Sequence, residues 1–108
     1  MKLTELNPRW AVGSRWDDEN GTQHYDMSTR HGMGITFDCP KHQRHRLAAF
    51  FDNPIDGLPP QHGEKYLWHR DGETFETLTL SPSIDASEHY FGNEGQCWHG
   101  FISKGEVQ

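Results

Sequence analysis

The two cysteines of the chain, each with a histidine close by, are the feature that most constrains its fold. Cys39 and His42 form a Cys-x-x-His spacing, and Cys97 and His99 form a Cys-x-His spacing near the other end. Thiolates and imidazoles at such spacings are typical zinc ligands, so the sequence predicts one structural Cys2His2 zinc site that joins two remote segments. The sequence leaves open whether His42 or His45 completes the first half. The shorter spacing of His42 matches a zinc knuckle better.

Such a metal site would stabilise a chain whose composition contains few apolar residues. The length of 108 residues suits a single domain, so the sequence predicts one zinc-stabilised domain over residues 1–108. Only 32% of the residues are hydrophobic and the mean hydropathy is −0.92, which indicates a thin apolar core. Four Trp, six Phe and three Tyr partly offset that shortage, because each aromatic ring buries a large area.

Turn signals between β-prone runs predict antiparallel hairpins in the first half of the chain. Residues 10–16 and 22–27 flank Asn20-Gly21, a pair that favours positive φ. Residues 31–34 are expected to form a flexible lead into a strand over 35–38, in which Ile35 and Phe37 alternate as on a half-buried strand. The run 44–51 is expected to return antiparallel to it.

The second half of the chain also has turn signals between β-prone runs. Asp71-Gly72 lies between β-prone runs over 65–70 and 73–80 and predicts a tight hairpin. Pro82 ends the pairing because it cannot donate to a ladder. A last strand over 97–102 precedes a terminal turn at Lys104-Gly105. The predicted fold class is therefore an all-β or β-rich small domain, whose antiparallel hairpins are tied by a zinc-knuckle or zinc-ribbon-like site.

The charge balance limits the partners. Ten Lys and Arg against sixteen Asp and Glu give a net charge of −6, which disfavours nonspecific nucleic-acid binding. The basic cluster Lys41, Arg44 and Arg46 holds the candidate contacts to a partner or a nucleic acid. Neither an apolar run long enough to span a membrane nor an export signal is recognisable, so the sequence predicts no membrane association and a cytoplasmic location.

Three segments of the chain resemble a family of small bacterial and phage proteins, the domain of unknown function number 6527. They are Gly34-Ile35-Thr36-Phe37-Asp38-Cys39-Pro40, Leu78-Thr79-Leu80-Ser81-Pro82-Ser83-Ile84, and Cys97-Trp98-His99-Gly100-Phe101-Ile102 with Gly105-Glu106-Val107. The likeness covers residues 32–107 and leaves 1–31 as an N-terminal hairpin extension. Members show a Cys-Pro-x-Cys-like knuckle, so this chain departs from them at His42. The resemblance implies a phage or mobile-element origin and a compact zinc-stabilised β domain, without an established reaction.

These observations together predict a noncatalytic zinc-stabilised binding protein. A closed metal site and the absence of a local catalytic motif favour that role over an enzyme, although the sequence leaves the point open. The expected partner is a host protein, with the chain as a phage accessory protein and inhibitor of host defence in the host cytoplasm. Two alternatives stay open: a zinc-dependent hydrolase with an open coordination position, and a nucleic-acid-binding zinc knuckle. The sequence predicts neither the partner's identity nor the oligomeric state.

Overall fold

Antiparallel hairpins make up most of the structure, as the sequence predicts. The computed structural model describes residues 1–17, 19–41, 45–60, 66–85 and 98–108. Within these residues, one short 3-10 helix accompanies nine strands, so the β-rich fold class is confirmed. In chain order the elements are η1 (Leu3–Leu6), β1 (Arg9–Asp17), β2 (Gln23–Asp38), β3 (Arg46–Phe50), β4 (His69–Asp71), β5 (Thr79–Ser81), β6 (Ile84–Asp85), β7 (His99–Gly100), β8 (Ile102–Ser103) and β9 (Glu106–Val107).

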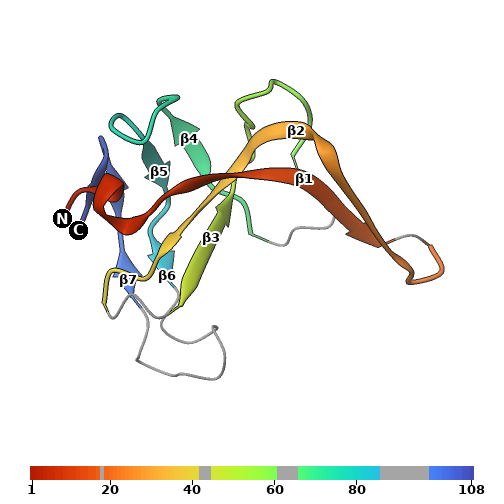
Figure 1. Cartoon of the computed structure of the whole chain (residues 1–108), viewed down its shortest axis with the longest axis horizontal. Coiled ribbons are helices and arrows are strands. Elements are labelled where there is room, and N and C mark those ends of the chain that lie inside the picture. The colour runs from red at the N-terminus through yellow and green to blue at the C-terminus, as the bar shows by residue number, and fades with distance from the viewer. Residues whose placement is uncertain (18, 42–44, 61–65, 86–97) are drawn as a thin grey trace.

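The long hairpin of β1 and β2 crosses the molecule, and β3 extends it to a sheet of order β1-β2-β3 (Figure 1). Gly21 has a φ of 78°, which agrees with the predicted Asn20-Gly21 turn. The expected flexible lead over 31–34 is wrong, because β2 runs unbroken for 16 residues. Gly32, with a φ of 72°, lies where the register with β1 shifts, so a bulge absorbs the irregularity and the pairing continues.

Gly32 also allows the loop that follows β3 to approach β2 closely. The backbone N–H of Ile55 donates to the Gly32 carbonyl at 2.9 Å. A Cβ atom at residue 32 would lie 2.6 Å from the Ile55 Cβ, so a larger residue would push this loop away. The loop therefore packs closely against β2 at Ile55.

Alternate residues of β2 and β3 face the core. Ile35 and Phe37 on β2, with Leu47 and Ala49 on β3, are buried in the i, i+2 pattern of a half-buried strand. The core lies between this sheet and the short strand pairs that follow it (Figure 1). The other large apolar residues of the core cluster are Leu3, Leu6, Phe51, Leu78, Leu80, Ile84, Ile102 and Val107.

The predicted tight hairpin at Asp71-Gly72 is wrong. β4 ends at Asp71 and β5 begins only at Thr79, with Asp71 paired to Thr79. A turn over residues 74–77 forms instead. In it the backbone N–H of Thr77 donates to the Thr74 carbonyl at 3.2 Å, and the two threonine hydroxyls lie 2.8 Å apart. Thr and Ser hydroxyls compete in this way with ladder hydrogen bonds, so the longer loop replaces a two-residue turn.

The terminal turn is confirmed and joins the two ends of the chain. Lys104 and Gly105, with φ values of 49° and 77°, connect β8 to β9. The backbone N–H of Leu3 donates to the Gly105 carbonyl at 2.8 Å, so η1 packs against this hairpin. The two termini accordingly lie side by side (Figure 1). In the described part of the chain, no helix has the length and apolarity needed to cross a lipid bilayer.

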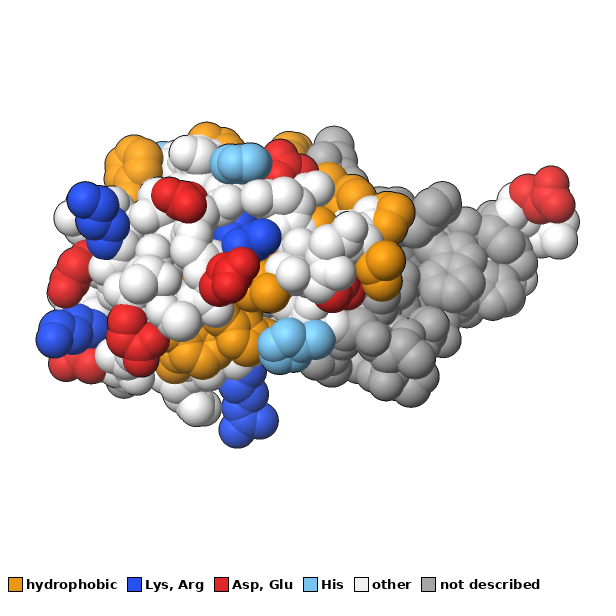
Figure 2. All heavy atoms as spheres, turned by 90° about the horizontal axis from the view of Figure 1, so that it is seen from above, with side chains coloured by type: hydrophobic (Ala, Val, Ile, Leu, Met, Phe, Trp, Pro, Cys, Tyr) orange, Lys and Arg blue, Asp and Glu red, His pale blue; other side chains and the backbone are white. Residues whose placement is uncertain are grey.

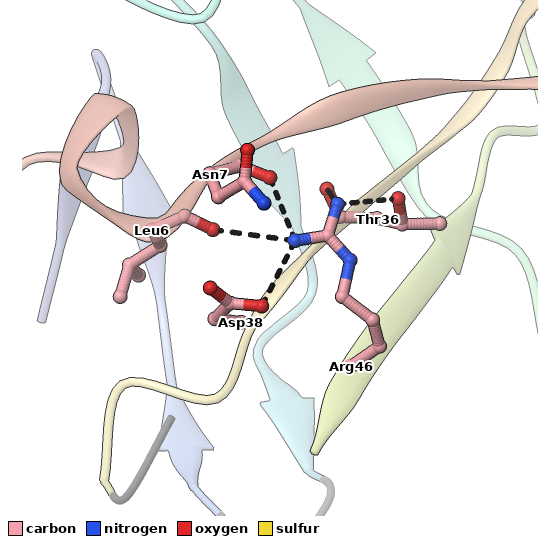
Figure 3. A network of polar contacts seen from close by, with 5 residues as sticks. All are labelled: Leu6, Asn7, Thr36, Asp38 and Arg46. Atoms are coloured by element: carbon pink, nitrogen blue, oxygen red, sulfur yellow. Dashed lines mark hydrogen bonds and ion pairs between the residues drawn. The ribbon is translucent and has the colours of Figure 1, made fainter. Parts of the chain in front are cut away.

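Arg46 fastens η1 to the sheet (Figure 3). Its Nη1 donates to the Asp38 Oδ1 at 3.0 Å and to the Asn7 carbonyl at 2.6 Å, and also contacts the Leu6 carbonyl. Its Nη2 donates to the carbonyl and to the Oγ1 of Thr36, at 3.1 and 2.9 Å. A planar guanidinium with several donors suits this arrangement, which a point charge could not satisfy.

We expect Arg46→Ala to lower the free energy of unfolding by about 1–3 kcal/mol, because charge-assisted hydrogen bonds are lost from a side chain that is about one-third exposed. Arg46→Lys keeps the charge beside Asp38 but not the forked geometry, so it should lose an intermediate amount. Guanidinium unfolding followed by tryptophan fluorescence measures both. Arg9→Ala at an exposed position is the control, and an equal loss there would contradict the assignment.

Candidate active site

Ser83 and His99 bring a hydroxyl and an imidazole together at the β6–β7 pair. The Ser83 Oγ lies 3.3 Å from the His99 Nε2. Ser83 directly precedes β6, and His99 opens β7. The register pairs Ile84 with Gly100 and Asp85 with His99, so Ser83 lies diagonally across from His99. His99 and Asp85 are exposed and Ser83 is partly so, which places this arrangement at the surface.

The local sequence explains this placement. Pro82 has no N–H and follows the last residue of β5, so the chain leaves one ladder before Ser83 and enters the next after it. Ile84 is buried and turns its neighbours on either side outward. Gly100 is buried as well, because a Cβ there would collide with the Gln108 carbonyl and lie 2.6 Å from the Trp98 Nε1. Buried Ile84 and Gly100 thus leave Ser83, Asp85 and His99 on the outward side.

This pair has the composition of an activated nucleophile. A serine hydroxyl attacks a carbonyl efficiently only when an adjacent base takes its proton, and an imidazole nitrogen within hydrogen-bond distance can do so. The separation of 3.3 Å is at the long end for this contact, as is common when no substrate is bound. With Nε2 unprotonated, the Ser83 hydroxyl donates to it, which is the direction that nucleophilic attack requires.

A tryptophan holds the main chain of the serine. The indole Nε1 of Trp68 donates to the Ser83 carbonyl at 3.2 Å. Trp68 is partly buried and packs against the core cluster. The backbone next to the hydroxyl is therefore tied to a segment that lies beside β3, since Trp68 forms a parallel bridge with Phe51.

A second set of Ser, His and Asp side chains lies on the β4–β5 pair. The Nδ1 of His69 lies 3.1 Å from the Asp52 Oδ1, and His69 pairs with Ser81 in the strand register. All three residues are exposed. In the described structure no hydrogen bond joins the Ser81 side chain to the His69 side chain, whereas the Ser83 hydroxyl and the His99 imidazole are in contact. Ser81 and His69 therefore serve as internal comparisons for the first pair.

The predicted zinc ligands fall into two groups. Cys39 is fully buried and belongs to the core cluster, and His99 contacts Ser83. His42 and Cys97 lie outside the described residues. Within the described ranges, no group of three or more His, Cys, Asp or Glu side chains could hold a metal ion. The backbone N–H of Cys39 donates to the His45 carbonyl at 2.8 Å, which closes the connection between β2 and β3. The zinc site stays a prediction.

The predicted contact residues have different surroundings. Lys41 is exposed, Arg44 lies outside the described residues, and Arg46 is engaged in the internal network of Figure 3. On the face shown in Figure 2, the described basic side chains lie among acidic and apolar ones. That face therefore offers a mixed surface rather than a continuous basic area, and a role for these residues in partner contact stays a prediction.

Sequence reasoning quoted Ser83 within a resemblance segment but gave it no role, and it predicted His99 as a metal ligand. The residue pattern around Ser83 is weak, because a single apolar residue, Ile84, lies between two polar ones. Serine and histidine in a catalytic pair are spatial neighbours, and no fixed local spacing announces them.

Comparison with protein families adds evidence of a different kind. Residues 12–108 match the family described as bacterial ubiquitination-like system serine protease (BubE). The chain belongs to the BubE family. The match begins at residue 12, inside the segment 1–31 that was expected to be an extension. Comparison with curated proteins and with solved structures gives no match.

BubE membership corrects several predictions. The resemblance to domain of unknown function 6527 is wrong as a family assignment, because the matching family is BubE. The prediction of a noncatalytic phage accessory protein that inhibits host defence is wrong too, since the family is described as a serine protease. The zinc-dependent hydrolase alternative named hydrolysis but attributed it to a metal instead of a serine. The noncatalytic role was inferred from a closed zinc site that includes His99, and in the structure the His99 imidazole lies beside the Ser83 hydroxyl.

Proposed function

We propose that this chain is a serine peptidase in which Ser83 is the nucleophile and His99 the general base. The observation that carries the proposal is the 3.3 Å approach of the Ser83 Oγ to the His99 Nε2 in a chain of the BubE family. The family description supports a serine enzyme, and among the hydrogen bonds described here this one joins a serine hydroxyl to an imidazole.

The chemistry follows from this pair. The Ser83 Oγ attacks the scissile carbonyl carbon while its proton passes to the His99 Nε2, giving a tetrahedral oxyanion. Collapse of that species breaks the C–N bond, and the imidazolium gives its proton to the leaving amine. The resulting Ser83 ester is hydrolysed by a water that His99 deprotonates. The carboxylic acid product leaves, and the Ser83 hydroxyl and neutral His99 are regenerated.

The substrate class follows from the family context. Its description places BubE in a bacterial ubiquitination-like system, which supports a protein of that system, or a conjugate of it, as the substrate. The exposure of His99 suits this assignment, because an extended polypeptide can lie across an exposed strand pair. Protein partners are therefore proposed in place of a host-defence target.

The zinc prediction is a separate proposal that competes with this one for His99. An imidazole bound to zinc through Nε2 has no lone pair left to accept the Ser83 proton. Cys39, His42 and Cys97 could still hold zinc with a fourth ligand, and that zinc would be structural. Zinc in the purified protein that disappears in His99→Ala would favour the metal assignment of this residue.

Asp85 is the proposed electrostatic support of His99. The register sets it directly opposite His99, which corresponds to a Cβ–Cβ separation of about 4.5–5.5 Å. Because both residues are exposed, the carboxylate stabilises the transient imidazolium only weakly. We expect Asp85→Asn to lower kcat by about two- to tenfold. Asp71→Asn, at an exposed position on β4, is the matched control. A loss of kcat as large as that of Ser83→Ala would contradict this purely electrostatic role.

The direct test of the proposed function is reaction with a fluorophosphonate probe. The Ser83 Oγ forms a bond to phosphorus, fluoride leaves, and His99 takes the proton. We expect one covalent adduct per chain, which peptide mass spectrometry maps to Ser83. Ser81→Ala should react like the wild type, and Ser83→Ala should not react. An adduct at Ser81, or none in the wild type, would refute the assignment.

A further inference from the structure

Trp68 makes a hydrogen bond to Ser83 that has no role in the proposed mechanism. Its indole Nε1 donates to the Ser83 carbonyl at 3.2 Å, across 15 positions of the chain. An indole N–H can only donate a hydrogen bond, and here its acceptor is the Ser83 carbonyl oxygen. The contact therefore constrains the peptide group that adjoins the nucleophile.

The main chain of Trp68 is itself anchored to the sheet. Its N–H donates to the Phe50 carbonyl at 2.8 Å, and its carbonyl accepts from the Asp52 N–H at 2.9 Å. The next two residues, His69 and Arg70, pair with β5. Trp68 thus connects the β1-β2-β3 sheet to the strand that leads into Ser83.

Ser83 needs such support because it lies between two short strands. β5 ends at Ser81 and β6 begins at Ile84, so Ser83 belongs to neither. Its Oγ already lies 3.3 Å from the His99 Nε2, and a shift of a few tenths of an ångström would take the two atoms beyond hydrogen-bond distance. Small displacements of catalytic groups have large effects on rate.

We propose that Trp68 is a positioning residue that holds the Ser83 main chain so that its hydroxyl stays against His99. This inference rests on the proposed function, because it assigns Trp68 a task only if Ser83 is the nucleophile. The indole N–H positions Ser83 through its hydrogen bond to the Ser83 carbonyl, and the ring contributes separately to stability by packing against the core.

Two substitutions separate the N–H from the ring. Trp68→Phe keeps much of the apolar volume and removes the donor. Trp68→His keeps an N–H, since the Nε2 of histidine occupies the same place in its five-membered ring as the indole Nε1, but it loses the fused six-membered ring. Stability should therefore fall in the order Trp, Phe, His. Reactivity of Ser83 should fall in the order Trp, His, Phe.

The measured quantities are the second-order rate constant of fluorophosphonate labelling at Ser83 and the melting temperature. We expect labelling to slow by about tenfold or more in Trp68→Phe and by about threefold in Trp68→His, despite the lower melting temperature of the histidine variant. Trp10→Phe is the control, because Trp10 is also partly buried but stacks on Phe75 at a centroid distance of 4.4 Å. Its labelling rate should stay within about twofold of the wild type.

Rates that follow the order of stability, or a Trp68→Phe variant that reacts like the wild type, would overturn the positioning role alone. A wild-type protein that is not labelled at Ser83 would overturn the proposed function, and this inference with it. The reversed orders of stability and reactivity would support the role, because a residue that acts only through packing would change both in parallel.

Discussion

Replacement of Ser83 by alanine is expected to lower the rate of substrate hydrolysis by about 10³-fold or more. The physical reason is that the variant has no nucleophile, so the covalent route is closed and only residual binding and orientation remain. Release of p-nitrophenolate from p-nitrophenyl acetate, together with cleavage of a fusion to a ubiquitin-like protein, measures the loss. Melting temperature and fluorescence should be unchanged, since Ser83 is a small, partly exposed residue.

His99→Ala should cause a loss of similar size, because the serine hydroxyl is then left without its base. The double variant Ser83→Ala/His99→Ala should be no slower than either single variant, since residues that act as one unit are not additive. This non-additivity distinguishes a catalytic pair from two independent surface residues.

The second Ser/His set provides matched controls within the same protein. Ser81→Ala and His69→Ala change the same residue types on the neighbouring strand pair, and His69 even has a carboxylate partner in Asp52 at 3.1 Å. Both variants should retain activity within about threefold of the wild type. If Ser81→Ala abolished activity and Ser83→Ala did not, the active site would have to be assigned to β4 and β5.

The fold was predictable where the pattern is local. Alternation at Ile35 and Phe37 indicates one buried face, and both side chains are fully buried. Asn20-Gly21 and Lys104-Gly105 predict turns because glycine tolerates positive φ, and Gly21 and Gly105 both adopt it. In each case, neighbouring residues contain the whole of the required information.

The misassigned hairpin shows where local patterns fail. Asp71-Gly72 is a strong turn signal, yet Leu78 is fully buried and Phe75 stacks on Trp10 at the distant strand β1. A two-residue turn would pair residues over 73–78 with β4, so it would compete with these tertiary contacts. Burial of Leu78 and the stacking of the partly buried Phe75 outweigh the preference of a turn dipeptide.

The candidate site was not predictable for a related reason. Ser83 and His99 are 16 residues apart, and their contact depends on pairing between β6 and β7, two strands of two residues each. Strands this short carry almost no periodic signal. His99 was noticed because of the nearby Cys97, and that proximity in sequence favoured a metal over a serine partner.

The core behind this site gives the largest expected effect on stability. Phe37→Ala should lower the free energy of unfolding by about 3–5 kcal/mol, since its fully buried ring leaves a cavity in a close-packed interior. The loss includes an edge-to-face contact with Trp98, whose ring centroid lies 6.0 Å away at an interplanar angle of 82°. Against a total stability of about 5–15 kcal/mol, this is a large fraction.

Thermal unfolding followed by circular dichroism measures this change, and we expect the melting temperature to fall by about 12 °C or more. Phe101→Ala is the matched control, because Phe101 is 55% exposed and its loss removes little buried area. Phe37→Leu should fall between the wild type and Phe37→Ala. Equal losses at Phe37 and Phe101 would contradict the described core.

The same substitution links stability to the candidate active site. Trp98 directly precedes His99, and its ring contacts Phe37 on β2. Without that ring to pack against, β7 should lose its fixed orientation before the whole chain unfolds. We therefore expect Phe37→Ala to slow fluorophosphonate labelling of Ser83 even at temperatures where the protein is folded. Phe37→Leu, which refills most of the cavity, should recover much of the rate. A full labelling rate in folded Phe37→Ala would mean that β7 holds His99 without help from the core.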